Sequence, residues 1–251
     1  MNYPFVVFAL SFLVLWLSMR IGVFVRNKRR ISPEDGDEDL TLIISAALTL
    51  LGLLIGFSFS MAISRYDLRK NYEEAEANAI GTEYLRADLL PVAAAPRVRL
   101  LLRKYLDQRV LFYRTRGESQ LRQVNADTSR LQSELWAAVS PSAAAVPTTG
   151  VTLAVSGMND VLNSQGYTQA AWWNRIPIAA WGLMVAIAIC CHILVGTNMH
   201  PTHNQAALLL VLPLIVSISF FLIAEIDSPR GGIIRVTPQN LASLSQSLPS
   251  N

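Results

Sequence analysis

The sequence predicts an all-α membrane protein with four transmembrane helices and a helical extramembrane domain inserted between the second and the third. Its 251 residues are 52% hydrophobic and only 16% charged, which is more apolar than is usual for a soluble protein of this length. Four segments are apolar over the length of about 20 helical residues that spans the hydrocarbon core of a bilayer. Between the second and the third segment, helix-forming residues recur with a helical apolar period.

The four apolar segments are residues 3–25, 40–63, 177–196 and 206–224. The second contains no charged residue, and the first contains only Arg20. Because Arg20 lies near the end of its segment, we expect its side chain to snorkel toward the basic residues at 26–30; a functional intramembrane charge is the alternative. The first segment lacks a basic leader and a small-residue cleavage site, so we expect it to remain as a membrane anchor.

Four crossings place both termini and residues 64–176 on one side of the membrane, and the loops at 26–39 and 197–205 on the other. Basic residues near the membrane ends are shared almost equally between the two sides. The preference of basic residues for cytoplasmic loops therefore separates the two orientations only slightly. We expect a multi-pass protein of the cell membrane whose helical domain is cytoplasmic.

The chain then divides into a first transmembrane hairpin (1–63), the helical extramembrane domain (64–175), a second transmembrane hairpin (176–226) and a C-terminal tail (227–251). In the helical domain, the first helix continues the second crossing through residues 64–90 and ends at Pro91. A second helix begins at Pro96, a residue that suits a first helical turn, and stops near Gly117. Its apolar residues form one helical stripe, made of Val98, Leu101, Leu102, Tyr105, Leu106 and Val110.

The rest of the helical domain is predicted to contain two further helices. The third covers residues 118–139 and ends at Pro141, and residues 140–150 read as a loop rich in Ser, Ala, Pro and Thr. The fourth covers residues 151–163. It leads to Trp172 and Trp173, which precede the third crossing at a depth where indole rings favour the membrane interface.

The helical domain contains neither histidine nor cysteine, the commonest residues for nucleophilic chemistry and transition-metal ligation. We therefore predict that the protein is not an enzyme and has no cofactor. Its acidic residues share one helix with basic residues, a pattern typical of a solvated or salt-bridged face; they are Glu73, Glu74, Glu76 and Glu83, beside Arg65, Arg69 and Lys70. Since acids and bases are interleaved along the chain, we expect no nucleic-acid partner.

All cysteines and histidines gather at one membrane edge, at Cys190, Cys191, His192, His200 and His203. A metal site there is conceivable. Their spacing matches no zinc pattern, however, and the cysteines lie inside an apolar helix. We predict a connecting loop with polar ends and no metal site.

Three stretches resemble a known family. They are residues 56–60 with 65–67, residues 76–81 with 89–91, and residues 225–238. They occur in the family's order and beside the expected crossings. Over about residues 40–244 the chain therefore resembles the bestrophin-like domain family of uncharacterised bacterial membrane proteins, and more distantly the bestrophin channels.

This resemblance implies a homo-oligomer, a pentamer in the channels, that passes ions through the bacterial inner membrane with both termini in the cytoplasm. Two departures limit what it implies. The helical domain is short for a bestrophin. The segment after Asp227 lacks the run of acids that forms the calcium clasp of animal bestrophins, so calcium gating is not expected.

Along the second crossing, small and weakly polar residues recur at steps of three and four, and therefore share one helix face; they are Ser45, Thr49, Gly52, Gly56, Ser60 and Ser64. One interpretation is a pore lining that Phe57 narrows. The other is close helix packing through Gly52 and Gly56. The sequence leaves both open.

A second candidate site lies at the membrane edge. The predicted topology brings Arg65, Arg69 and Arg175 to the same membrane surface as Glu225 and Asp227. Because an unpartnered carboxylate at the hydrocarbon edge is costly, we expect Glu225 or Asp227 to pair with one of the three arginines. Exposure of these groups to headgroups and water is the alternative.

Two functions from different classes follow. The first is a bestrophin-like homo-oligomeric protein acting as a passive ion channel in the lipid bilayer. The second is a non-conducting membrane scaffold or sensor, whose helical domain binds a protein partner that the sequence does not identify. Secondary transport is a third possibility, but neither discontinuous helices nor repeated segments are evident.

Overall fold

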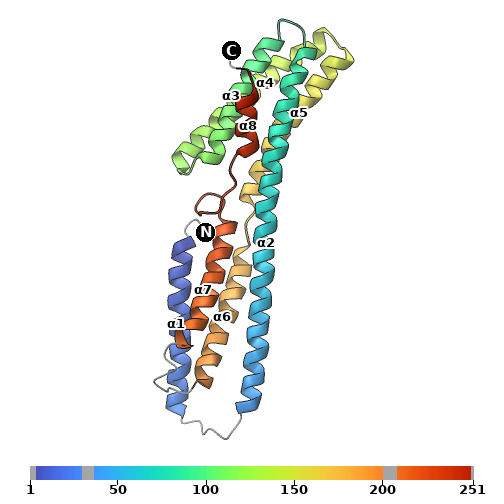
Figure 1. The fold of residues 1–251 in the computed structure, drawn as a ribbon. Helices are drawn as coiled ribbons and strands as arrows, with labels where there is room; N and C mark the ends of the chain where they lie inside the picture. Colours follow the sequence, from blue (N-terminus) through green and yellow to red (C-terminus); the bar gives the residue numbers. More distant parts are fainter. Residues whose placement is uncertain (1–3, 30–36, 200–207, 250–251) are drawn as a thin grey trace. The chain divides into compact units, whose positions relative to one another are not determined.

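A computed structural model describes residues 4–29, 37–199 and 208–249. Figure 1 shows that the regular structure in these residues is helical. In chain order the elements are α1 (Pro4–Arg29), α2 (Asp37–Arg86), the short 3-10 helix η1 (Ala87–Leu89), α3 (Ala95–Arg114), α4 (Glu118–Ala145), α5 (Thr149–Trp173), α6 (Ile178–Asn198), α7 (Leu208–Asp227) and α8 (Gln239–Ser247).

Among the described residues, four helices are long and apolar enough to cross a membrane. They are α1, the N-terminal part of α2, α6 and α7, and they cover the described residues of the four apolar segments almost completely. The predicted all-α class and the four apolar helices are therefore confirmed.

The chain forms two compact units. The first comprises Met1–Arg65 and Arg175–Arg235, and the second comprises Tyr66–Asn174 and Val236–Asn251. Helix α2 contributes residues to both units. The second unit also contains α8, a helix in the segment that the sequence predicts only as a C-terminal tail.

In the first unit, α1 packs against α6 and α7. The closest approach is between Gly22 of α1 and Gly196 of α6, where a Cβ atom on Gly22 would lie 2.3 Å from the carbonyl oxygen of Ile193. A Cβ atom on Gly196 would likewise lie 2.3 Å from the carbonyl oxygen of Met19. Without a hydrophobic force between helices in lipid, such backbone contact is a main source of helix association.

In the second unit, α3, α4 and α5 pack around a core that the C-terminal part of α2 and α8 complete. The predicted stripe of α3 is buried at Val98, Leu102 and Tyr105, as expected. Val124, Leu131 and Leu135 of α4 are buried against it.

Three predicted helix boundaries in this unit were wrong. Helix α4 continues through Pro141 to Ala145. Proline inside a helix removes a hydrogen bond and crowds the preceding turn, and the burial of Val139 and Ser142 offsets this cost. Helix α5 begins at Thr149, inside the predicted loop, where the Thr148 hydroxyl oxygen accepts a hydrogen bond from the Val151 N–H at 3.3 Å.

Helix α5 also runs on to Trp173 instead of ending near residue 163. The polar residues that suggested an end are buried and bonded. The Ser164 hydroxyl donates to the Val161 carbonyl at 2.7 Å, and the Thr168 hydroxyl donates to the Glu76 carboxylate at 3.2 Å. The Ser164 bond lies within α5, whereas the Thr168 bond to Glu76 of α2 is a tertiary contact that outweighs the low helix propensity of the segment.

The contact between α1 and α6 gives a first testable prediction. Gly22→Ala or Gly196→Ala should destabilise the protein by about 1 to 3 kcal/mol, because the added methyl group overlaps backbone atoms that cannot move independently. Gly182→Ala, also on α6, is the matched control, since a Cβ atom there would meet no neighbouring residue within 4 Å. Thermal unfolding in detergent measures the difference. Equal midpoints for all three variants would contradict the contact.

Candidate functional site

The small-residue face of α2 is exposed in the single chain. All six residues of the stripe are exposed, and so is Phe57. No atom of a neighbouring residue lies within 4 Å of a Cβ position on Gly52 or Gly56. Of the 18-residue apolar stretch of α2, only 6% is buried, whereas 44% of the corresponding stretch of α7 is buried. This helix face therefore has no cover from the helices of its own chain that the structure describes.

The hydroxyl groups of Ser45 and Thr49 already have hydrogen-bond acceptors within α2. The Ser45 hydroxyl donates to the Thr41 carbonyl at 2.9 Å, and the Thr49 hydroxyl donates to the Ser45 carbonyl at 2.8 Å. These bonds within the helix satisfy the hydroxyl hydrogens and leave oxygen lone pairs on the surface. Such a face can contact a neighbouring helix or water.

At the membrane edge, Arg65 and Asp227 lie together. The Arg65 guanidinium nitrogen Nη1 is 3.6 Å from the Asp227 carboxylate, and the two side chains are 15% and 6% exposed. Asp227 also accepts hydrogen bonds from the Ile176 N–H at 3.1 and 3.2 Å. One carboxylate thereby contacts α2, the end of α7 and the segment before α6.

Glu225 has a different environment. Its buried carboxylate oxygen Oε2 accepts hydrogen bonds from the N–H groups of Ile233 and Ile234, at 2.6 and 3.4 Å. A Cβ atom on Gly232 would lie only 2.3 Å from this oxygen, so the turn requires glycine there. Glu225 thus organises the turn that follows α7.

Arg69 and Arg175 complete the predicted group of charges. The buried Arg69 donates to the carbonyls of Ala171 and Asn174, each at 3.2 Å, and so caps the C-terminal end of α5. Arg175 lies half-buried in the segment between α5 and α6. Of the five charged residues, the structure brings Arg65 and Asp227 within ion-pair distance.

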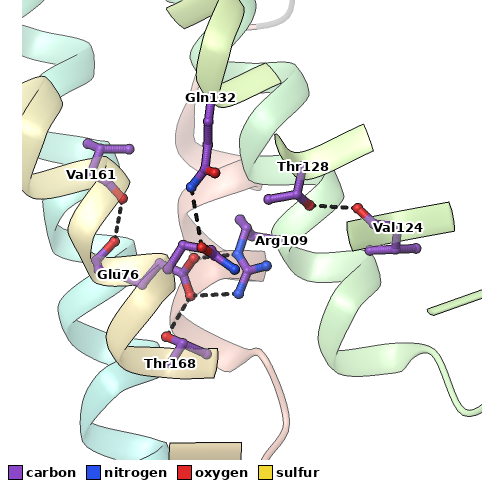
Figure 2. A network of polar contacts seen from close by, with 9 residues as sticks. Glu76, Arg109, Val124, Thr128, Gln132, Val161 and Thr168 are labelled. Atoms are coloured by element: carbon purple, nitrogen blue, oxygen red, sulfur yellow. Dashed lines mark hydrogen bonds and ion pairs between the residues drawn. The ribbon is translucent and has the colours of Figure 1, made fainter. Parts of the chain in front are cut away.

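A buried polar network in the second unit was not predicted from the sequence. Figure 2 shows Glu76 between Arg109 of α3 and Thr168 of α5. Arg109 forms an ion pair with Glu76, and both side chains are 0% exposed. Burial, the largest single effect, would lower the pKa of Arg109, but Glu76 together with Tyr105 and Tyr113 raises that pKa above its usual value. Arg109 therefore remains a cation inside the core.

The expected face was solvated or salt-bridged. Glu74 is exposed and Glu76 is salt-bridged to Arg109, whereas Glu73 and Glu83 are buried, so they are not solvated. Positions 73, 76 and 83 differ by three and seven residues and so share one helix face. That face turns toward α3, α5 and α8. This spacing was the sequence signal for a buried acidic face, because solvent-exposed acids need not recur on one side of a helix.

Glu73 binds the first turn of α8 through hydrogen bonds. Its carboxylate accepts hydrogen bonds from the Leu241 N–H at 2.9 Å and from the Asn240 side-chain amide at 2.7 Å. A carboxylate at the first turn of a helix satisfies free N–H groups and opposes the helix dipole favourably.

Cys190, Cys191 and His192 lie in α6, whereas His200 and His203 lie outside the described residues. In the part of the chain that the structure describes, no group of three or more His, Cys, Asp or Glu residues is arranged to hold a metal ion.

The contact between Arg65 and Asp227 gives a second prediction. Arg65→Gln or Asp227→Asn should cost about 3 to 5 kcal/mol if the pair acts as a buried one, against under about 1 for a solvated pair. The double mutant should cost less than the sum of the single changes, and thermal unfolding in detergent measures this coupling. Lys70→Gln combined with Asp227→Asn is the control and should be additive. Additive costs for Arg65 and Asp227 as well would show that the two charges are independent.

Comparison with known proteins places this geometry in a family. A crystal structure of a bacterial bestrophin homologue from Klebsiella pneumoniae has a TM-score of 0.67 and 14% sequence identity, covering 96% of this chain and 99% of that chain. A leucine-to-threonine variant of that homologue has a TM-score of 0.66 and 14% identity, covering 95% and 96% of the two chains. At this identity the likeness shows the fold alone. No curated protein matches the sequence. The family model of the bestrophin-like domain matches residues 5–241, and the chain therefore belongs to the bestrophin-like family.

Proposed function

We propose that the protein assembles into a symmetric homo-oligomer, a pentamer by resemblance, that acts as a passive ion channel with the small-residue face of α2 toward the symmetry axis. The observation that carries this proposal is the exposure of that face in the single chain. Gly52 and Gly56 have no neighbour within 4 Å of their Cβ positions, although the other three apolar helices pack together. A face of hydroxyl and backbone groups gains little from contact with lipid tails.

A central pore can be enclosed only by several copies of the chain. One protomer has too few crossing helices to enclose a central pore, whereas rotation about one axis would place one α2 from each copy around it. The hydroxyl oxygens of Ser45 and Thr49 could then contact water or permeating ions, since their hydrogens are already bonded within α2.

Location and orientation extend the same proposal. We place the four apolar helices in the cell membrane, the bacterial inner membrane by resemblance, with the second unit in the cytoplasm forming a vestibule. The buried charged groups of the second unit support a position outside the hydrocarbon, where water and a polar surround lower the cost of Glu76 and Arg109.

The alternative is a non-conducting scaffold or sensor whose second unit binds a protein partner. Gly52 and Gly56 also favour it, because two glycines four residues apart allow another helix to approach closely. In that arrangement the same helix face would be closed by packing and no water-filled path would remain.

The third prediction separates the two functions. Purified protein in mild detergent should show the mass of a closed oligomer, and the same preparation in liposomes should release a trapped ion down its gradient. Gly52→Leu should reduce flux or assembly, because the large side chain fills the face that the proposal puts at the axis. Ile43→Ala, at an exposed apolar position on the opposite side of the same helix, is the control and should leave both unchanged.

Each outcome decides between the functions. An oligomer without flux would support the scaffold and remove the channel. If the protein remained monomeric at all accessible concentrations, the symmetric assembly and its pore would be ruled out, because a single four-helix chain cannot form either.

The fourth prediction concerns Phe57, whose side chain is 61% exposed beside Gly56. If its ring narrows the pore, Phe57→Ala should raise flux, by on the order of tenfold for each 1.4 kcal/mol that the constriction adds to the barrier. Phe24→Ala is the matched control, because Phe24 is 66% exposed on α1, a helix that the proposal does not put at the axis. Unchanged flux in an assembled Phe57→Ala variant would rule out the constriction.

A further inference from the structure

Glu83 is the one carboxylate on the buried face of α2 that lacks a hydrogen bond among the described residues. Its side chain is 0% exposed, and neither carboxylate oxygen has a hydrogen-bond partner there. Glu73 and Glu76, on the same face, each accept hydrogen bonds from groups on other helices. Burial of an ionised carboxylate without such partners is very costly, whereas its neutral form is tolerated.

Helix α5 leaves a space shaped for this side chain. A Cβ atom on Gly157 of α5 would lie 2.1 Å from Oε2 of Glu83 and 2.4 Å from Nη1 of Arg86. The glycine therefore admits both side chains into the contact between α2 and α5. Any larger residue at 157 would displace them.

Two charged groups act on Glu83, one from each helix of the contact. Arg86 lies one turn further along α2, and Asp160 lies on α5 three residues after Gly157. Burial raises the pKa of Glu83, Arg86 lowers it, and Asp160 raises it, with a net result of about 8. Burial is the largest of the three effects, so the neutral acid is favoured at neutral pH.

We propose that Glu83 is a proton-binding site at the contact between α2 and α5, which holds the two helices together when protonated and loosens them when its proton passes to solvent water. Burying the neutral acid against Gly157 costs far less than burying the carboxylate. The carboxylate needs water or a cation, and in the closed contact only Arg86 could supply compensation. Ionisation therefore favours a state in which α5 moves away and water enters.

The sign of the pH dependence follows from proton linkage. The pKa of Glu83 is raised in the folded protein from 4.5 to about 8, so the folded state retains a proton that the unfolded state has lost. The stabilising effect is complete below the unfolded pKa and is lost as pH rises through the folded one. Between these values the folding equilibrium constant should fall about tenfold for each pH unit because of this group.

Thermal unfolding of the full chain in detergent, from about pH 6 to about pH 9, tests the proposal. Glu83→Gln keeps the shape of the neutral acid and cannot ionise, so its stability relative to the native chain should increase with pH until about pH 8. Glu74→Gln removes an exposed carboxylate from the same helix and should follow the native chain at every pH. A constant difference between Glu83→Gln and the native chain, or a loss of stability of Glu83→Gln at high pH, would overturn the proposal.

The geometry has its own test, which does not depend on ionisation. Gly157→Ala should destabilise the native chain strongly, and should cost less in a Glu83→Ala background, because the overlap with the carboxylate is then gone and only that with the flexible Arg86 side chain remains. An equal cost in both backgrounds would show that Gly157 does not accommodate Glu83. All these measurements report stability, so they stand whether or not the protein conducts ions.

Discussion

The burial of carboxylates along α2 is the constraint on which the second unit depends. An acid can enter a protein core only if it is partnered or protonated, and α2 carries three acids on one buried face. Each one connects α2 to a different part of the unit. Glu73 holds the start of α8, Glu76 joins Arg109 of α3 to Thr168 of α5, and Glu83 packs against Gly157 of α5. A purely apolar face would pack as tightly but would specify neither which helix binds where nor in which register.

The same rule operates in the first unit with a different solution. Glu225 and Asp227 lie at the end of α7 with both side chains buried, where a charge without a partner is costly. Asp227 is stabilised by Arg65 and the Ile176 N–H, and Glu225 by the backbone of the turn that it organises. Gly232 is part of this arrangement, because only a residue without Cβ lets the chain pass so close to the Glu225 carboxylate.

The sequence predicts the apolar helices well and the buried polar contacts poorly, for a physical reason. Length and hydropathy are local properties, so α1, α6 and α7 could be placed from their own residues. The partners of Glu76 and Glu73 lie 33 and 168 residues away, and no local pattern reports such contacts. The sequence could suggest the pairing of Arg65 with Asp227, because four alternating crossings would bring these helix ends to one membrane surface. The contacts of Glu225 could not be predicted, because its partners are backbone groups. The continuation of α4 through Pro141 likewise depends on packing from other helices.

The contact between Gly22 and Gly196 also constrains how the chain is made. Residues emerge from the ribosome in order, at about 5 to 20 per second, and the partner glycine follows only after α2 to α5 have been synthesised. Until then the surface of α1 that packs against α6 and α7 is uncovered. The first unit therefore closes late, after most of the chain has been synthesised.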